Sequence, residues 1–119
     1  MKTLVIGAST KPERYSYKAV NSLLDHNHEV VPMSVKRGEI RGLKILNDKP
    51  PLEEIHTVTL YVSSKNQPEY YDYIINKIKP KRVIFNPGTE NPEFEKKVKE
   101  AGIEATIACT LVLLSTDQF

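Results

Sequence analysis

Short apolar runs alternate along the chain with longer segments in which apolar residues recur every three or four positions. The short runs are rich in β-branched residues and are typical of buried strands, whereas the longer segments are typical of amphipathic helices. The predicted strands cover residues 4–6, 29–33, 57–62, 82–85 and 103–107, with a smaller strand at 44–46. Pro32 cannot donate a ladder hydrogen bond, so the second strand should end near it.

Three helices are predicted from the longer segments. Their apolar positions are Ala19, Val20, Leu23 and Leu24 in the first, Tyr71, Ile74, Ile75 and Ile78 in the second, and Phe94, Val98 and Ala101 in the third. The polar residues 63–66 are suited to cap the second helix. Asn91 and Pro92 suit the N-cap and first position of the third, and Gly102 suits its C-terminal end. A short packed helix is predicted at residues 110–114.

This alternation of strands and helices with short connections predicts the α/β class. Parallel strands need crossover connections, and right-handed crossovers place helices on both faces of a sheet. We therefore expect residues 1–119 to form a single Rossmann-like, doubly wound domain with a mainly parallel sheet of five to six strands. Ligands of such sheets bind beyond the carboxyl ends of the strands. The loops at that edge would be residues 7–14, 34–38, 63–66, 86–91 and 108–109.

Composition narrows the classes of partner. Of the 119 residues, 39% are hydrophobic and 27% charged, the proportions of an ordinary globular domain. The 17 basic residues against 15 acidic ones give a net charge of +2, which predicts no nucleic-acid partner. No apolar stretch has the length of a membrane span, so no membrane partner is expected. The single cysteine, Cys109, excludes an internal disulfide and favours a reducing, cytoplasmic compartment.

The histidines and the cysteine predict neither a metal site nor a catalytic centre. His26 and His28 lie two positions apart, which suits no common metal motif, and His56 is isolated, so we interpret all three as surface residues. Cys109 precedes an apolar run and is interpreted as a buried thiol rather than a nucleophile. No Ser-His-Asp or paired-carboxylate arrangement stands out, and no catalytic residues are predicted.

The loop of residues 7–12 holds the first candidate chemistry. Gly7 directly follows a strand, and Ser9, Thr10 and Lys11 then supply two hydroxyls and a cation. A glycine lets the backbone turn sharply and approach a ligand closely, and phosphate is the natural ligand of such a set. Neither the full G-x-G-x-x-G fingerprint nor the P-loop pattern is present, so a simple chain turn is the alternative.

The end of the second predicted strand reads Met33-Ser34-Val35-Lys36-Arg37. NAD-binding proteins usually place an acidic residue here, where it hydrogen-bonds to the ribose diol. Lys36 and Arg37 instead suit a ribose that carries a phosphate, as in coenzyme A (CoA) or NADP. A solvated basic loop is the alternative interpretation.

Residues 86–91 form a third candidate loop, rich in turn-forming residues. Asn86 and Gly88 follow a predicted strand, so we expect them to line a pocket at the ligand edge of the sheet. An ordinary strand-to-helix connection explains the same residues without a ligand.

Several of these features occur together in one known family. They are the V-I-G-A-S run at Val5 to Ser9, Lys11-Pro12, Arg14, Val31-Pro32, Gly38, Gly42, Thr57-Val58, Asn86-Pro87-Gly88 and Cys109. With these residues the chain resembles the small stand-alone CoA-binding domain proteins, which are similar in turn to the CoA-binding domain of the succinyl-CoA synthetase α subunit. The resemblance covers nearly the whole chain.

The resemblance implies a Rossmann fold that holds CoA or an acyl-CoA, with the diphosphate near Gly7, Ala8 and Ser9 and the adenine end near the second strand. It also implies that the ligand is bordered by Lys11, Arg14, Pro32, Met33, Val62, Ser63, Asn86 and Gly88. Lys36 and Arg37 complete the candidate cofactor-binding residues. The resemblance implies no catalysis, because the phosphorylated histidine of the synthetase belongs to a separate domain.

We therefore expect a small non-catalytic module that binds CoA or acyl-CoA as a carrier, sensor or partner subunit, with a protein partner or a homodimer left open. One alternative is a minimal NADP-dependent oxidoreductase, which Lys36 and Arg37 also suit. Another is an interaction domain with a vestigial nucleotide site. Two departures from the family pattern support this last alternative, namely Met33-Ser34-Val35 in place of Val-Asn-Pro and Phe85 in place of a tryptophan.

Overall fold

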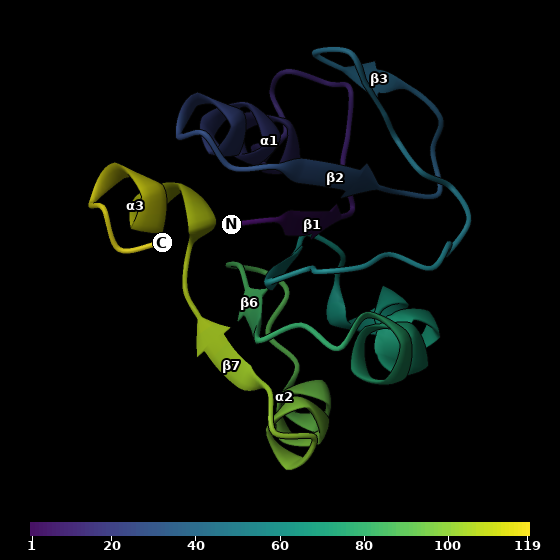
Figure 1. The fold of residues 1–119 in the computed structure, drawn as a ribbon. Helices are drawn as coiled ribbons and strands as arrows, with labels where there is room; N and C mark the ends of the chain where they lie inside the picture. The colour runs from purple at the N-terminus through teal and green to yellow at the C-terminus, as the bar shows by residue number, and fades with distance from the viewer.

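A five-stranded, fully parallel sheet forms the centre of the computed structural model, which describes residues 1–119 (Figure 1). Its strands, in spatial order, are β2 (Val30–Met33), β1 (Thr3–Ile6), β5 (Thr57–Leu60), β6 (Arg82–Phe85) and β7 (Glu104–Ile107). The predicted α/β class and parallel sheet are confirmed. β2 lies at one end of the sheet order and finishes one residue after Pro32, as predicted, because a proline is tolerated in such a strand.

Helices cover both faces of the sheet. They are α1 (Tyr15–Asp25), α2 (Pro92–Glu100), α3 (Thr110–Ser115) and three short segments, η1 (Ser64–Asn66), η2 (Pro68–Tyr70) and η3 (Tyr73–Ile78). In Figure 1, α1 and α3 lie to the left of the sheet, and the teal η segments and α2 lie to its right and lower right. Val5 of β1 packs in a cluster with Leu23 of α1 and Leu114 of α3, whereas Leu4 packs in a second cluster with Phe94 of α2. Alternate residues of one strand therefore supply the two halves of the core.

The segment after β5 differs from the regular α-helix that its apolar stripe predicts. In η3 the N–H of Lys79 donates to the carbonyl of Ile74 at 2.9 Å, the five-residue spacing of a π-helix. The buried face of this segment differs from the predicted one, since Tyr71 and Ile75 are only partly buried. The buried positions are Tyr70, Tyr73, Ile74 and Ile78. Ser63 precedes η1, but its side chain accepts from Asn66 Nδ2 and caps no backbone N–H, so the predicted cap is wrong.

α2 follows its sequence signals closely. The side chain of Asn91 accepts a hydrogen bond from the N–H of Phe94 at 3.2 Å, and Pro92 occupies the first helical position. Phe94 and Val98 are fully buried, whereas Ala101 is exposed, so the predicted buried face is one residue too long. Gly102 ends the helix with a φ of +79°, the left-handed conformation expected there.

A small antiparallel hairpin of β3 (Glu39–Ile40) and β4 (Leu43–Lys44) follows β2 in the chain and forms a separate two-stranded sheet. The predicted strand at residues 44–46 is wrong in its bounds. Lys44 belongs to the hairpin, and Leu46 forms only an isolated bridge with Met33. The apolar run marked the right region, but pairing with the preceding residues set the strand.

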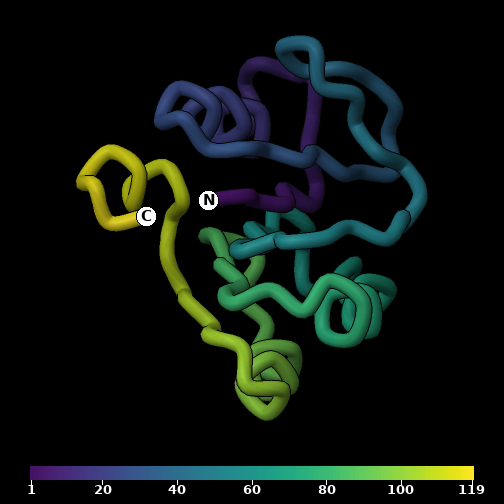
Figure 2. The backbone as a smooth tube through the Cα atoms, viewed as in Figure 1, coloured from purple at the N-terminus to yellow at the C-terminus, as the bar shows by residue number.

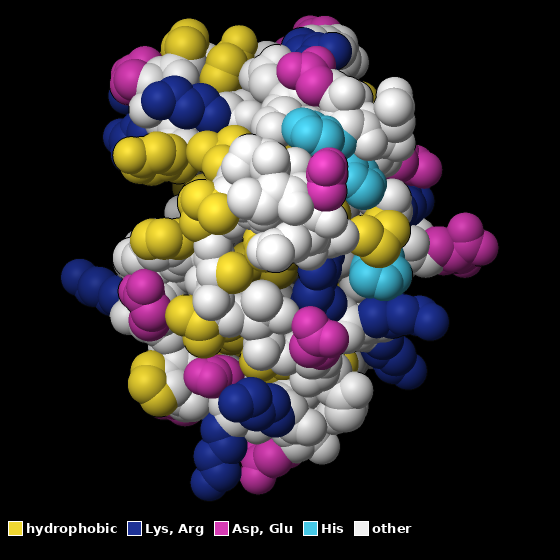
Figure 3. Space-filling model, turned by 90° about the vertical axis from the view of Figure 1, so that its left-hand side faces the viewer, with side chains coloured by type: hydrophobic (Ala, Val, Ile, Leu, Met, Phe, Trp, Pro, Cys, Tyr) yellow, Lys and Arg dark blue, Asp and Glu magenta, His cyan; other side chains and the backbone are white.

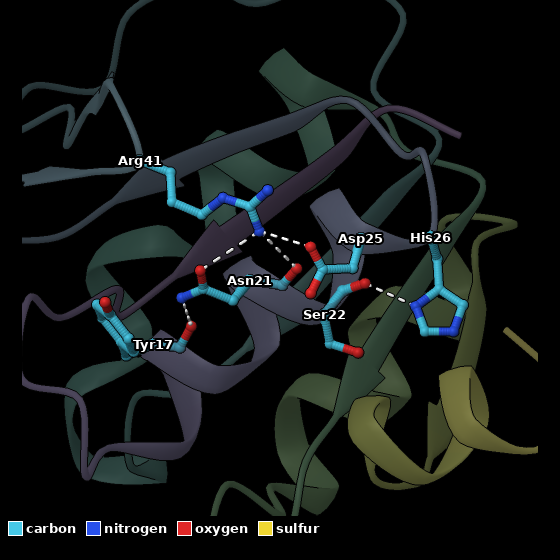
Figure 4. Close-up of polar contacts among 6 residues, drawn as sticks. All are labelled: Tyr17, Asn21, Ser22, Asp25, His26 and Arg41. Carbon is cyan, nitrogen blue, oxygen red and sulfur yellow. Dashed lines mark hydrogen bonds and ion pairs between the residues drawn. The ribbon is translucent and has the colours of Figure 1, made fainter.

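Arg41 fastens this hairpin to α1. The turn gives Arg41 and Gly42 positive φ angles of 49° and 84°, the signs that a tight two-residue hairpin turn requires. From there the Arg41 guanidinium donates to Asp25 Oδ1 at 2.7 Å and to the carbonyl and side-chain oxygens of Asn21 at 3.3 and 3.4 Å (Figure 4). The hairpin is therefore held against the helix that begins at the ligand edge.

The two chain ends lie near each other, on either side of His28 (Figure 2). The terminal amine is 2.7 Å from His28 Nδ1, and the Phe119 ring centroid is 5.0 Å from that of His28. On the face drawn in Figure 3 the histidine side chains gather along one side, among charged residues. His28 and His56 precede β2 and β5, so they lie at the amino edge of the sheet, opposite the candidate ligand edge. None of the helices combines the length and apolar character that crossing a bilayer requires.

Candidate functional site

A cleft of about 560 Å³ lies at the carboxyl edge of the sheet. The loops that follow β2, β1, β5 and β6 all contribute to it, so it spans four neighbouring strands. The lining residues are Gly7, Ala8, Ser9, Arg14, Tyr15, Ser16, Ser34, Val35, Lys36, Tyr61, Val62, Ser63, Asn66, Pro87, Gly88 and Thr89. This is the edge at which doubly wound sheets bind their ligands.

Gly7 forms the floor of the cleft where β1 ends. Its φ is +95°, and a Cβ atom there would lie 2.9 Å from the backbone carbon and oxygen of Tyr61. The N–H groups of Gly7 and Ala8 both donate to the carbonyl of Met33, at 2.8 and 3.0 Å. This glycine therefore allows the ends of β1, β2 and β5 to meet closely. It shapes the floor, while its own N–H is already used within the protein.

Backbone N–H groups without a partner begin further along the same loop, at the start of α1. The loop residues before it are already paired: the N–H of Lys11 donates to Ser9 Oγ at 3.1 Å, and the N–H of Arg14 donates to the carbonyl of Lys11 at 3.0 Å. Arg14 is the N-cap of α1, and no side chain caps the helix. The first N–H groups of a helix have no intrahelical acceptor, and they carry its partial positive charge. The start of α1, at Tyr15 and Ser16 in the cleft wall, thus suits a phosphate group.

The cleft carries positive charge without any carboxylate in its lining. Arg14 and Lys36 are the charged lining residues. Together with Lys11 and Arg37 they are exposed and belong to none of the ion pairs of the structure. Because none of the four forms an ion pair within the protein, these cations are available to a phosphorylated ligand.

The loop that carries Lys36 is held in place by side-chain hydrogen bonds. Asn47 Nδ2 donates to the carbonyls of Ser34 and Lys36, at 3.1 and 2.8 Å. The N–H of Lys36 donates to Ser34 Oγ at 3.2 Å. The backbone of this basic loop is therefore fixed, although the Lys36 side chain extends into solvent.

Asn86 is buried beneath the cleft rather than exposed in it. Only 1% of its surface is accessible. Its Nδ2 donates to Thr59 Oγ1 at 2.6 Å and to the Leu60 carbonyl at 2.8 Å, and its Oδ1 accepts from the N–H of Thr110 at 2.9 Å. The side chain thus joins the ends of β5 and β6 to the start of α3.

Gln67 supports the neighbouring loops in the same way. This fully buried residue donates from Nε2 to the carbonyls of Val62 and Thr89, at 3.0 and 2.8 Å, and accepts from Asn91 Nδ2 at 3.0 Å. Val62 and Thr89 both line the cleft, on different loops. Gln67 therefore sets the distance between those loops. Sequence reasoning missed it, because glutamine is usually exposed and nothing in the local pattern marks it as buried.

A second cavity, of about 250 Å³, adjoins the cleft. Its lining residues are Tyr15, Tyr61, Asn86, Pro87, Cys109 and Leu111, of which the first two and Pro87 also line the cleft. Cys109 is partly exposed here, so its interpretation as a buried thiol is wrong. It follows the outermost strand β7, where the sheet gives it less cover than an inner strand would.

Tyr61 stands between the two cavities. Its hydroxyl is buried without a hydrogen-bond partner, although the hydroxyls of Thr59 and Thr110, which pair with each other at 2.8 Å, lie nearby. Burial raises the pKa of Tyr61 well above its usual value. The ring is therefore a neutral, rigid wall at physiological pH.

The structure brings most of the sequence-predicted residues together. Those that line the cleft are Gly7, Ala8, Ser9, Arg14, Lys36, Val62, Ser63 and Gly88. Those outside its lining are Lys11, Pro32, Met33, Arg37 and Asn86. Pro32 and Met33 are buried in β2, and Met33 contributes its carbonyl to the turn at Gly7. Lys11 and Arg37 are exposed beside lining residues.

Several further lining residues also escaped sequence reasoning. Tyr15 and Ser16 begin α1, so locating the helix start would have placed them in the cleft. Tyr61 falls within the predicted strand of residues 57–62, which in fact ends at Leu60, and this two-residue error hid its position at the ligand edge. Val35 and Pro87 lie in loops that were predicted to face the ligand, although neither was singled out.

Comparisons with known proteins identify the family and the fold. A family model described as CoA binding domain matches residues 1–115. A solved structure described as an uncharacterized protein is 50% identical, with a TM-score of 0.96, over 99% of this chain and 97% of that one. A hypothetical protein from Pyrococcus horikoshii OT3 is 32% identical, with a TM-score of 0.86, over 96% of this chain and 81% of that one. A protein redesigned for binding is 27% identical, with a TM-score of 0.87, over 98% and 82%. No curated protein matches the chain.

Proposed function

The chain belongs to the CoA-binding domain family, and from this premise we propose that it binds CoA or an acyl-CoA in the cleft as a non-catalytic module. The match over residues 1–115 confirms the family resemblance inferred from the motifs and supports CoA binding in general. The proposal adds the position of the ligand and the role of the protein. That role is a carrier, a sensor or the ligand-binding partner of another subunit.

One observation carries the proposal: the cleft presents Arg14, Lys36 and the uncapped start of α1, with no carboxylate in its lining. CoA carries three phosphate groups, two in its diphosphate and one on the ribose. A ligand of that charge is favoured by several separate cationic positions and disfavoured by any nearby acidic side chain. An NAD-type ribose would instead find no acidic partner at the end of β2.

The order of the strands supports one orientation of the ligand. Lys36 follows β2, at one end of the sheet, and suits the 3′-phosphate of the ribose. The start of α1 follows β1 and suits the diphosphate. The remainder of CoA would then extend over the ends of β5 and β6, toward Tyr61 and Pro87.

A binding role also agrees with the side chains that line the cleft. They are hydroxyls, an amide, apolar groups and two cations, without a histidine or carboxylate to act as a general base. A hydroxyl without such a base is a weak nucleophile. The cations at the rim are exposed in a single chain, so the cleft does not need a second chain to supply its charge. A protein partner or a homodimer stays a prediction.

Isothermal titration of ligand-stripped protein with CoA and with dephospho-CoA, which lacks the 3′-phosphate, tests the proposal. We expect CoA to bind more tightly than dephospho-CoA. The variant Lys36→Ala should lose affinity for CoA by about tenfold, as for one charged contact, with little change for dephospho-CoA. Lys97→Ala, an exposed lysine of α2 outside the cleft, is the matched control.

Three results would contradict different parts of the proposal. Binding of NADP in preference to CoA would favour the minimal oxidoreductase. The absence of binding heat with every nucleotide would favour an interaction domain with a vestigial site. Equal losses for both CoA forms in Lys36→Ala would leave CoA binding intact and overturn the orientation.

A further inference from the structure

The smaller cavity beside the cleft differs from it in chemistry. Its wall consists mainly of two tyrosine rings, Pro87 and Leu111, with the Cys109 thiol. Asn86 also contributes, but its amide oxygen and nitrogen are already bonded to Thr110, Thr59 and Leu60. No charged side chain lines the cavity. It therefore offers mainly apolar contact and no oppositely charged partner for a charge.

The cavity lies where the far end of a bound CoA would arrive. In the proposed orientation the nucleotide lies over β2 and β1, and the rest of the ligand extends across β5 and β6. Tyr15, Tyr61 and Pro87 line both the cleft and the cavity, so the two spaces meet at these side chains. The cavity then continues toward Cys109 and Leu111, at the start of α3.

The size of the cavity limits what it can hold. A cavity of about 150 Å³ is enough for benzene. At about 250 Å³, this one has room for a short hydrocarbon group but falls below the range of pockets that enclose a drug-sized ligand. A short, uncharged acyl chain fits both its volume and its apolar wall.

We propose that this cavity receives the acyl group of a short-chain, uncharged acyl-CoA, so that the protein prefers such a thioester to free CoA. The inference rests on the proposed function, because the cleft must first hold the CoA portion. Burying an additional methylene should tighten binding about fourfold. A terminal carboxylate would be desolvated without a cationic partner and should cancel that gain.

Titration of ligand-stripped protein with CoA, butyryl-CoA and succinyl-CoA tests the proposal without any mutation. Butyryl and succinyl groups have the same number of carbon atoms and differ in ending with a methyl group or a carboxylate. We expect butyryl-CoA to bind at least tenfold more tightly than CoA, and succinyl-CoA to bind no more tightly than CoA. Equal affinity for CoA and butyryl-CoA, or a tighter succinyl-CoA complex, would overturn the proposal.

A pair of variants then locates the acyl group. Leu111→Trp places a larger ring in the cavity wall and narrows the cavity, so it should remove most of the preference for butyryl-CoA, with CoA binding unchanged within about twofold. Val112→Trp is the control, because Val112 is 55% exposed and lies outside the cavity wall. A preference for butyryl-CoA that Leu111→Trp leaves undiminished would place the acyl group elsewhere. Absence of CoA binding in the wild-type protein would instead overturn the proposed function, and this inference with it.

Discussion

Asn86 Oδ1 accepts a hydrogen bond from the backbone N–H of Thr110 at 2.9 Å, and this bond ties the end of β6 to the start of α3. The same amide donates to the Leu60 carbonyl at the end of β5. This junction adjoins both cavities, because Asn86 lines the smaller one and Tyr61, which follows Leu60, lines both. Asn86 therefore determines the spacing of the elements that surround the ligand edge.

Replacing Asn86 with alanine should destabilise the fold by about 3 kcal/mol, because the buried N–H of Thr110 and the Leu60 carbonyl would lose a partner. Chemical denaturation followed by circular dichroism measures this loss. Asn76→Ala is the control, since Asn76 is exposed and should change stability by no more than about 0.5 kcal/mol. A stable Asn86→Ala protein that has lost only CoA affinity would show that Asn86 acts as a ligand contact instead.

Gly7→Ala should also destabilise the protein, for two reasons that a second glycine can separate. An alanine at φ +95° is strained, and its Cβ would lie 2.9 Å from the Tyr61 backbone. Gly102 has a similar φ of +79°, but no atom lies within 4 Å of the position that a Cβ would take there. Gly102→Ala therefore reports the backbone strain alone, about 1 kcal/mol. We expect a clearly lower denaturation midpoint for Gly7→Ala. Equal midpoints would mean that the contact with Tyr61 relaxes freely.

Arg14→Ala should weaken CoA binding by about tenfold while leaving the melting temperature nearly unchanged, because an exposed N-cap arginine without a side-chain cap adds little to stability. Arg37→Ala should have a smaller effect, since Arg37 lies outside the cleft lining. Titrations at two salt concentrations measure both variants. The Arg14 contribution should shrink as salt rises, and a salt-independent loss would argue against a contact between charges.

The sequence predicts most of the fold, because the inner strands are short runs of mostly β-branched and apolar residues. The ends of α2 also carry residues typical of a helix N-cap, a first helical position and a helix C-terminus, namely Asn91, Pro92 and Gly102. The prediction fails at η3, where the backbone forms a π-helix and buries Tyr70 and Tyr73, which the apolar stripe of a regular α-helix does not predict. The hairpin also escapes prediction, since its turn places a non-glycine residue, Arg41, at positive φ. Contacts with α1 compensate for this conformation, and they are distant in sequence.

The candidate site could also be predicted from the sequence only in part. Loops that follow strands can be assigned to the ligand edge once the sheet is parallel, and this reasoning placed Ser9, Lys36 and Gly88 correctly in the cleft wall. It cannot distinguish a side chain that faces the ligand from one that is buried below it. Asn86 illustrates the difference, because its burial depends on Thr59 and Thr110, which belong to other elements.

Tyr61 makes the stability of the protein sensitive to alkaline pH. Burial raises the pKa of this phenol in the folded state, while the unfolded chain titrates near the ordinary value of about 10. The folded protein then holds the proton more tightly, so the contribution to stability is complete below pH 10 and is lost progressively above it. Burial likewise raises the pKa of Tyr73, to about 12, so two tyrosines act in the same direction.

The variant Tyr61→Phe isolates the share of this alkaline loss of stability that is due to Tyr61. Because the hydroxyl has no hydrogen-bond partner, its removal should leave stability at pH 8 unchanged or slightly higher. At pH 11 the wild-type protein should have lost more stability than the variant, since only the wild type retains this phenol. Urea denaturation at the two pH values measures the difference.

Tyr73→Phe should also reduce the loss of stability between pH 8 and pH 11. At pH 8, however, it should cost about 1 kcal/mol, because the Tyr73 hydroxyl donates to the Pro50 carbonyl at 2.6 Å. Parallel pH profiles for wild type and Tyr61→Phe would mean that the Tyr61 hydroxyl is reached by solvent in the folded protein.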